Sequence, residues 1–95
     1  MKNKVVTRDS LVCQVEDIIA SDIDGETVMM SVENGKYYGL DSIGSVVWKM
    51  VAEPVKVADL IDTLVEKYEV DRITCENDVL VFLNSLNDDG ILQVS

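Results

Sequence analysis

The fold of this chain is decided by Asn34-Gly35-Lys36-Tyr37-Tyr38-Gly39-Leu40-Asp41-Ser42-Ile43-Gly44-Ser45-Val46-Val47-Trp48. The opening Asn-Gly pair favours a two-residue hairpin turn, because both central positions of a type I′ turn need a positive φ. The β-favouring pattern stops at Asp41, whose short carboxylate can accept hydrogen bonds from the free N–H groups of a following helix. The stretch therefore predicts a strand, Lys36–Leu40, that leads into a helix beginning near Ser42. We expect the functional surface beside this junction.

The residues before the junction predict an antiparallel sheet. The segments Ile18–Ile23 and Glu26–Glu33 have the composition of strands, and Asp24-Gly25 between them is a second two-residue turn signal. Two such turns in succession predict a three-stranded meander whose third strand is Lys36–Leu40.

Two-residue turns also fix the register of this meander. They place Ala20 opposite Met29, Met29 opposite Leu40, Met30 opposite Gly39, and Val32 opposite Tyr37. One face then carries Ile19, Ile23, Val28, Met30, Val32 and Tyr37. The other face carries Ile18, Ala20, Met29, Tyr38 and Leu40. Both faces are partly apolar, so either helices cover parts of both or one face is left for a partner.

Three helices are predicted after the junction. The first runs from Ser42 to about Val51 and ends before Pro54, which disfavours helical geometry at the residue preceding it. Trp48 lies off the apolar stripe of this helix and is expected as a core or rim anchor. The second helix spans Val57–Tyr68 and carries one continuous apolar stripe.

The third helix is predicted over Cys75–Asn87, with Thr74 as its N-cap. It ends at Asp88-Asp89-Gly90, since Gly90 suits the left-handed position that follows a helix. Ile91–Val94 then fits a short final strand or an extended end.

These elements predict an α+β fold of the winged helix-turn-helix type, with an N-terminal three-stranded antiparallel sheet followed by three helices. The last two helices correspond to the helix-turn-helix and the hairpin to the wing. Leu11–Val15 is a short strand or an extended arm. Residues 1–10 are expected as a flexible tail, and residues 11–95 as a single domain.

The composition argues against nucleic acid and membranes as partners. The chain has 95 residues, a net charge of −10 and only 8 Lys and Arg residues, too few for a phosphate backbone. A basic peptide or a basic protein face is a better electrostatic match, although acidity also keeps a small protein soluble. The longest apolar run, Val79–Leu83, is too short to span a bilayer. The N-terminus lacks a signal-peptide core, and Cys13 and Cys75 form no metal or redox spacing, so a bacterial cytoplasm with free thiols is expected.

Catalytic chemistry is not expected, because the chain has no histidine, no Cys/His metal cluster and no phosphate-binding glycine loop. No cofactor is implied. One alternative comes from Leu40-Asp41-Ser42-Ile43, which resembles the phosphopantetheine attachment site of acyl and peptidyl carrier proteins. In that interpretation Ser42 carries the group. A carrier protein has a long helix and a loop before this site, where the present chain has two hairpin signals.

From Lys36 to Trp48 the sequence resembles the PqqD-like family, and more narrowly the standalone recognition proteins of lasso peptide pathways. Those proteins carry an aromatic pair, Gly-Leu, Asn or Asp, and a small residue at the helix start. The segment Asp78-Val79-Leu80-Val81-Phe82-Leu83-Asn84-Ser85-Leu86, followed by Gly90-Ile91-Leu92, is similar to the family's C-terminal pattern. The resemblance covers residues 15–95. The strong acidity departs from it and bears on which leader sequence is preferred.

The resemblance implies a non-catalytic protein that binds the leader of a ribosomally made precursor peptide and presents it to a leader peptidase and a macrocyclase. A PqqD-like chaperone for another peptide-modifying enzyme is the alternative within this class. The resemblance further implies that the leader adds as an antiparallel strand beside the third strand, against the third helix. The candidate residues are Lys36, Tyr37, Tyr38, Gly39, Leu40, Asp78, Val81, Phe82 and Ser85.

The residues themselves support strand addition. The third strand of a meander is an edge with unpaired N–H and C=O groups, which invites an added strand. Gly39 leaves room for another chain, and Tyr37 or Tyr38 can stack on a leader side chain. Val81 and Phe82 are expected as an apolar floor and Asp78 as the partner of a basic residue. Tyr38, Leu40 and Phe82 also fit core positions, and Lys36 also fits a charge that prevents edge aggregation.

Overall fold

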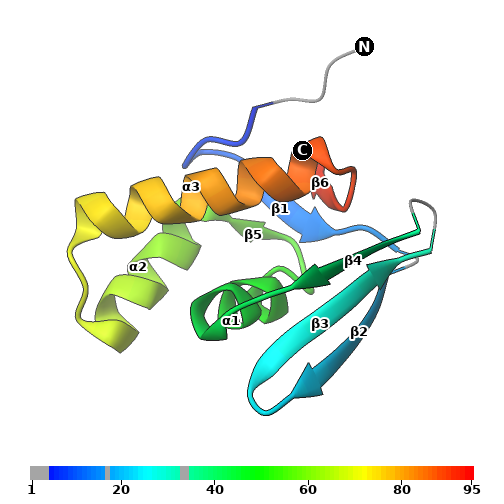
Figure 1. Ribbon diagram of the computed structural model, residues 1–95. Coiled ribbons are helices and arrows are strands. Elements are labelled where there is room, and N and C mark those ends of the chain that lie inside the picture. Colours follow the sequence, from blue (N-terminus) through cyan, green and yellow to red (C-terminus); the bar gives the residue numbers. More distant parts are fainter. Residues whose placement is uncertain (1–4, 17, 33–34) are drawn as a thin grey trace.

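The computed structural model describes residues 5–16, 18–32 and 35–95, which form three helices and six strands (Figure 1). In chain order these are β1 (Leu11–Gln14), β2 (Ile18–Ile23), β3 (Glu26–Ser31), β4 (Lys36–Gly39), α1 (Ser42–Met50), β5 (Val55–Lys56), α2 (Val57–Tyr68), α3 (Arg72–Asp88) and β6 (Leu92–Val94). The sheets have the orders β2-β3-β4 and β5-β1-β6. The predicted fold class is confirmed: an N-terminal three-stranded antiparallel sheet precedes three helices.

The register of the first hairpin is as predicted. Ala20 lies opposite Met29, and both turn residues have a positive φ, 53° at Asp24 and 84° at Gly25. Two consecutive positive φ values are what a type I′ turn requires.

The register of the second hairpin differs from the prediction by two residues. Tyr37 lies opposite Met30 rather than Val32, and the last pair is Ser31 with Lys36. Gly35 has a φ of 65° and its N–H donates to the Ser31 carbonyl at 2.8 Å, so a longer turn replaces the predicted two-residue one. Asn34, half of the predicted turn, lies outside the described residues. The shift by two keeps each side chain on its predicted face, because side chains alternate with period two.

One of the two predicted faces is the core face. Thr27, Met29 and Ser31 of β3 are buried on it, and Leu40 is buried just after β4. Ile19, Ile23 and Tyr37 are exposed on the opposite, outer face. The helices therefore cover only one side of this sheet.

The helices and the second sheet supply the rest of the core. Trp48 is buried, which confirms it as a core anchor, and α2 buries the stripe that its apolar spacing predicts. The core residues are Val6, Val12, Met29, Leu40, Val47, Trp48, Val51, Val57, Leu60, Ile61, Leu64, Cys75, Val79, Leu83, Leu86, Ile91 and Leu92.

The third helix begins earlier than predicted. It starts at Arg72, and its N-cap is Asp71 rather than Thr74. The Asp71 carboxylate accepts from the Thr74 backbone N–H at 2.9 Å and from the Thr74 hydroxyl at 3.1 Å. These bonds hold the pKa of Asp71 below its usual value. Threonine is a residue type that often caps helices, but Thr74 lies inside the first turn and donates to Asp71, the residue that forms the cap.

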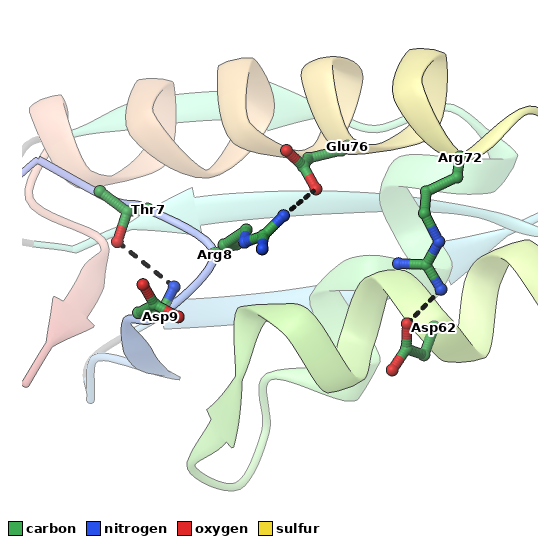
Figure 2. Close-up of polar contacts among 6 residues, drawn as sticks. All are labelled: Thr7, Arg8, Asp9, Asp62, Arg72 and Glu76. Carbon is green, nitrogen blue, oxygen red and sulfur yellow. Dashed lines mark hydrogen bonds and ion pairs between the residues drawn. The ribbon is translucent and has the colours of Figure 1, made fainter.

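Part of the predicted flexible tail is a packed arm. Val6 is 2% exposed, and Asn84 of α3 holds its backbone at both ends: the Val6 N–H donates to Asn84 Oδ1 at 2.8 Å, and Asn84 Nδ2 donates to the Val6 carbonyl at 3.1 Å. Arg8 forms an ion pair with Glu76 at 3.7 Å (Figure 2). Residues 5–10, expected as part of a flexible tail, thus make packed contacts, because α3 offers both an apolar site and a matching amide. Residues 1–4 lie outside the described residues.

The second sheet pairs strands that are far apart in the chain. β1, predicted as a strand or an arm, pairs with β6, the predicted final strand, and also with the two-residue β5, which has no sequence signal of its own. Across the turn between the last two helices, Asp62 of α2 pairs with Arg72 of α3 (Figure 2).

The junction between β4 and α1 is held by two side chains. The Asp41 carboxylate accepts from the Gly44 N–H at 2.7 Å, as predicted for the N-cap. Ser45, which is buried, accepts from the Thr27 N–H at 2.8 Å and lies 3.4 Å from the Leu40 carbonyl as a donor. The Ser45 hydroxyl thus links β3 to the end of β4 where the ladder of backbone bonds stops.

Replacing Ser45 with alanine should lower the free energy of unfolding by about 1–3 kcal/mol, since it leaves the buried Thr27 N–H without its acceptor. Chemical denaturation followed by circular dichroism measures this change. The control is Ser42→Ala, an exposed serine in the same helix, for which about 0.5 kcal/mol or less is expected. Equal effects of both substitutions would contradict this role of Ser45.

Candidate functional site

The free edge of β4 presents main-chain groups at alternate residues. The Leu40 N–H donates to the Thr27 carbonyl at 2.8 Å, so Leu40 faces β3. In an antiparallel ladder the direction of the N–H and C=O groups alternates, so Tyr38, which pairs with Met29, also faces β3. The N–H and C=O groups of Tyr37 and Gly39 therefore point outward from the sheet. Figure 1 shows β4 as the strand of this sheet nearest to α3.

The side chains of β4 have different environments. Tyr37 is 75% exposed on the outer face of the sheet, and Lys36 is also exposed. Tyr38 is half-buried against the core, and its hydroxyl is buried with no hydrogen-bond partner among the described residues. Leu40 is 8% exposed and belongs to the core, so its side chain occupies the core position that was one of its two predicted roles.

One side of α3 carries the predicted helical site residues. Phe82 is half-buried and packs against the core, whereas Asp78 and Ser85 are exposed. Val81 is 72% exposed and takes no part in the core. These residues are three or four positions apart in the helix and thus lie on neighbouring parts of one side.

A cleft of about 310 Å³ lies between the first turn of α1 and the middle of α3. Its lining residues are Asp41, Ile43, Gly44, Val47, Asp78, Val79 and Phe82. Gly44 permits this close approach: a Cβ atom there would lie 3.5 Å from Phe82 Cζ and 3.1 Å from Asp41 Oδ1. The cleft begins directly after β4, because Asp41 is two residues beyond the end of that strand.

The structure brings the predicted site residues together only in part. Asp78 and Phe82 share the cleft, whereas Val81 and Ser85 line a neighbouring groove of about 530 Å³ on α3. The β4 residues line neither the cleft nor the groove. The strand ends two residues before Asp41, which lines the cleft. Sequence reasoning missed Ile43 and Gly44, although both belong to the stretch that decides the fold.

The cleft is acidic and partly apolar. Asp41 and Asp78 lie on it, and none of its lining residues is Lys or Arg. A basic or apolar side chain therefore suits it better than an anion. Burial raises the pKa of the adjacent Cys75 thiol and Asp78 raises it further, which disfavours the reactive thiolate.

The described residues hold neither a candidate metal site nor a membrane-spanning helix. No group of three or more His, Cys, Asp or Glu residues among them is placed to hold a metal ion. None of the helices in the described part of the chain is long and apolar enough to cross a membrane. Cys13 and Cys75 are both free cysteines.

The chain is similar to known proteins in both sequence and structure. The family profile described as "Coenzyme PQQ synthesis protein D (PqqD)" matches residues 26–92. The structure of TbiB1 in complex with the TbiA(beta) leader peptide is 31% identical, covers 85% of this chain and 94% of that chain, and has a TM-score of 0.78. No curated protein sequence matches this chain.

Two further solved structures share the fold at lower identity. Lasso peptide synthetase B1, complexed with the leader peptide, is 22% identical with a TM-score of 0.75 and covers 86% of this chain and 96% of that chain. The PqqD truncation of Methylobacterium extorquens PqqCD, described as a stand-alone RiPP recognition element, is 20% identical with a TM-score of 0.72 and covers 87% and 88%. The β2–β4 sheet and the three helices are thus an arrangement found in other proteins.

Proposed function

Since this chain belongs to the PqqD family, we propose that it binds the leader segment of a ribosomally synthesised precursor peptide and catalyses no reaction itself. The observation that carries this proposal is the free β4 edge beside α3, with the outward main-chain groups of Tyr37 and Gly39. The 31%-identical TbiB1 was solved with a leader peptide bound, which supports the same class of ligand.

The leader binds by adding an antiparallel strand to β4. Its backbone accepts from and donates to the outward groups of Tyr37 and Gly39, and main-chain bonds of this kind hold a peptide without regard to its sequence. Gly39 has no atom within 4 Å of the position a Cβ would occupy, so the peptide meets open space there. The exposed ring of Tyr37 lies at the same edge and can stack on a leader side chain.

Side chains from α3 and α1 select the sequence of the leader. Phe82, Ile43 and Val81 offer apolar contacts, and Ser85 can hydrogen-bond to the peptide. Asp78 favours a basic residue in the leader, in keeping with the net charge of −10. The cleft between α1 and α3 thus takes an apolar side chain with a basic neighbour.

The chain then presents the bound precursor to modifying enzymes. In a lasso peptide pathway these are a leader peptidase and a macrocyclase in the bacterial cytoplasm. No cofactor takes part in this binding step. The carrier-protein alternative requires a long helix and a loop before Ser42, and the structure has β4 there.

The test is a titration of this protein into a fluorescently labelled leader peptide, followed by anisotropy. The leader is taken from the precursor encoded beside this protein, and a scrambled peptide of the same composition is the control. Saturable binding of the native leader alone is expected. Equal binding of both peptides would contradict specific recognition, and no binding at high micromolar protein would contradict the proposed function.

A further inference from the structure

The N-terminal arm, residues 5–10, is joined to α2 by main-chain hydrogen bonds. The Ser10 carbonyl accepts from the Val57 N–H at 2.9 Å. The Arg8 carbonyl accepts from the Ala58 N–H at 2.8 Å. The N-cap residue of α2 makes no side-chain hydrogen bond of its own. Because the first N–H groups of a helix have no partner within it, the arm carbonyls supply the capping acceptors that α2 lacks.

Asn84 fastens the same arm to α3. Its side-chain amide bonds both main-chain groups of Val6, and its Nδ2 also donates to the Leu80 carbonyl at 2.9 Å. Val6 is buried, and Arg8 pairs with Glu76 (Figure 2). Glu76, Leu80 and Asn84 are spaced four residues apart, so these contacts follow one side of α3. The arm therefore links the start of α2 to one side of α3.

The cleft proposed for the leader lies on nearly the opposite side of α3. Asp78 and Phe82 line this cleft, and each is two residues from Leu80 on the arm side. Two residues correspond to about 200° around a helix axis, so the arm and the cleft meet α3 from opposing sides. The fit at the cleft is tight, since a Cβ atom on Gly44 would lie 3.5 Å from Phe82 Cζ. A shift of α3 therefore changes the cleft, because close-packed contacts transmit strain.

We infer that Asn84 is a positioning residue for leader binding: through the arm it holds α3, and with it Asp78 and Phe82, at the spacing from α1 that the leader requires. The inference rests on the proposed leader-binding function and adds a residue that acts on the site from the opposing side of the helix. Arm docking and leader binding are then coupled, and such coupling is reciprocal. The docked arm should strengthen leader binding by roughly fivefold or more, and the leader should strengthen arm docking by the same factor.

The first test compares two leucine substitutions in α3. Asn84→Leu keeps the branched shape of the side chain but removes the hydrogen bonds to Val6, so the leader affinity should fall by roughly fivefold or more. The control is Asn77→Leu, at an exposed asparagine of the same helix, for which the leader affinity should stay unchanged. Anisotropy titration with the labelled leader measures both affinities, at a temperature where circular dichroism shows each variant folded. An unchanged affinity in folded Asn84→Leu protein would overturn the inference, and so would equal losses in both variants.

The second test follows the Val6 amide of the wild-type protein and therefore does not depend on whether a variant folds. This N–H is bonded to Asn84 Oδ1, so its hydrogen exchange reports how often the arm opens. In the absence of leader it should exchange faster than the core amides, which report global unfolding. Leader addition should slow its exchange by about the factor by which Asn84→Leu lowers leader affinity. A Val6 exchange rate that the leader leaves unchanged, or one equal to that of the core amides, overturns the inference.

The two tests also separate this inference from the proposed function. Wild-type protein that binds no leader overturns both. Wild-type protein that binds leader, with no loss of affinity in folded Asn84→Leu protein, overturns the positioning role of Asn84 alone. Lower unfolding free energy with unchanged leader affinity in that variant would make Asn84 a structural residue only. Lower affinity in Asn84→Leu, together with slower Val6 exchange in the leader complex, supports the inference.

Discussion

Replacing Tyr37 with proline is expected to abolish leader binding while the protein stays folded. The Tyr37 N–H points away from β3, so its loss removes no bond within the sheet. It does remove a donor for the added strand, and the proline ring occupies the place of that hydrogen bond. Edge strands tolerate proline for this reason. We expect leader affinity to fall by roughly a hundredfold or more, which corresponds to about 2.7 kcal/mol of binding free energy.

Two matched variants separate the possible causes of this loss. Tyr37→Ala keeps the backbone donor and removes only the ring, so it should weaken leader binding less than Tyr37→Pro does. Tyr38→Pro removes a donor that faces β3, so its main effect should be a lower free energy of unfolding. Anisotropy titration and denaturant unfolding of the three variants measure both quantities. Full leader binding by folded Tyr37→Pro protein would show that the peptide does not pair with β4.

Reversing the charge of Asp78 should lower the affinity for a basic leader by about tenfold, or about 1.4 kcal/mol of binding free energy. Asp78 lines the cleft between α1 and α3, where it lies with Asp41 and no Lys or Arg. Asp78→Lys both removes the attraction for a basic leader residue and adds repulsion. The effect should decrease with added salt, because the side chain is exposed and its field is screened.

The control for Asp78→Lys is Glu66→Lys on the exposed side of α2, which changes the net charge by the same amount. If overall charge alone attracts the leader, both substitutions will lower the leader affinity equally. If the charge acts at the site, Asp78→Lys will lower the leader affinity more than Glu66→Lys does. Anisotropy at two salt concentrations decides between these results, and an unchanged affinity for Asp78→Lys would remove Asp78 from the site.

Much of the fold follows from local chemistry. The Asp24-Gly25 turn, the Asp41 cap and the apolar stripe of α2 each depend on a few neighbouring residues, and each is found in the structure. The small residues of the junction also carry the family resemblance that the comparisons confirm. Local signals failed where two acceptable choices lay close together: Asp71 and Thr74 can both cap a helix, and the more N-terminal residue does so.

From the sequence, the candidate site could be predicted only as two separate sets of residues. The sequence names β4 and the exposed side of α3, but it does not contain the cleft between α1 and α3, because that cleft depends on how closely Gly44 approaches Phe82. It also does not give the cross-strand partners of the β4 residues. That depends on the register of the second hairpin, which a longer turn shifts by two residues. The shift reassigns each cross-strand partner but leaves the faces unchanged.

The sequence by itself determined the class of the fold, the order of its main elements and the two faces of the first sheet. These depend on turn chemistry and on the period of apolar residues, which act over a few positions. Only the tertiary structure decided which face is the core, that residues 5–10 pack as an arm on α3, and which residues pair between β3 and β4. Those outcomes depend on contacts between residues far apart in the chain, such as Val6 with Asn84 and Thr27 with Ser45, and no local pattern records them.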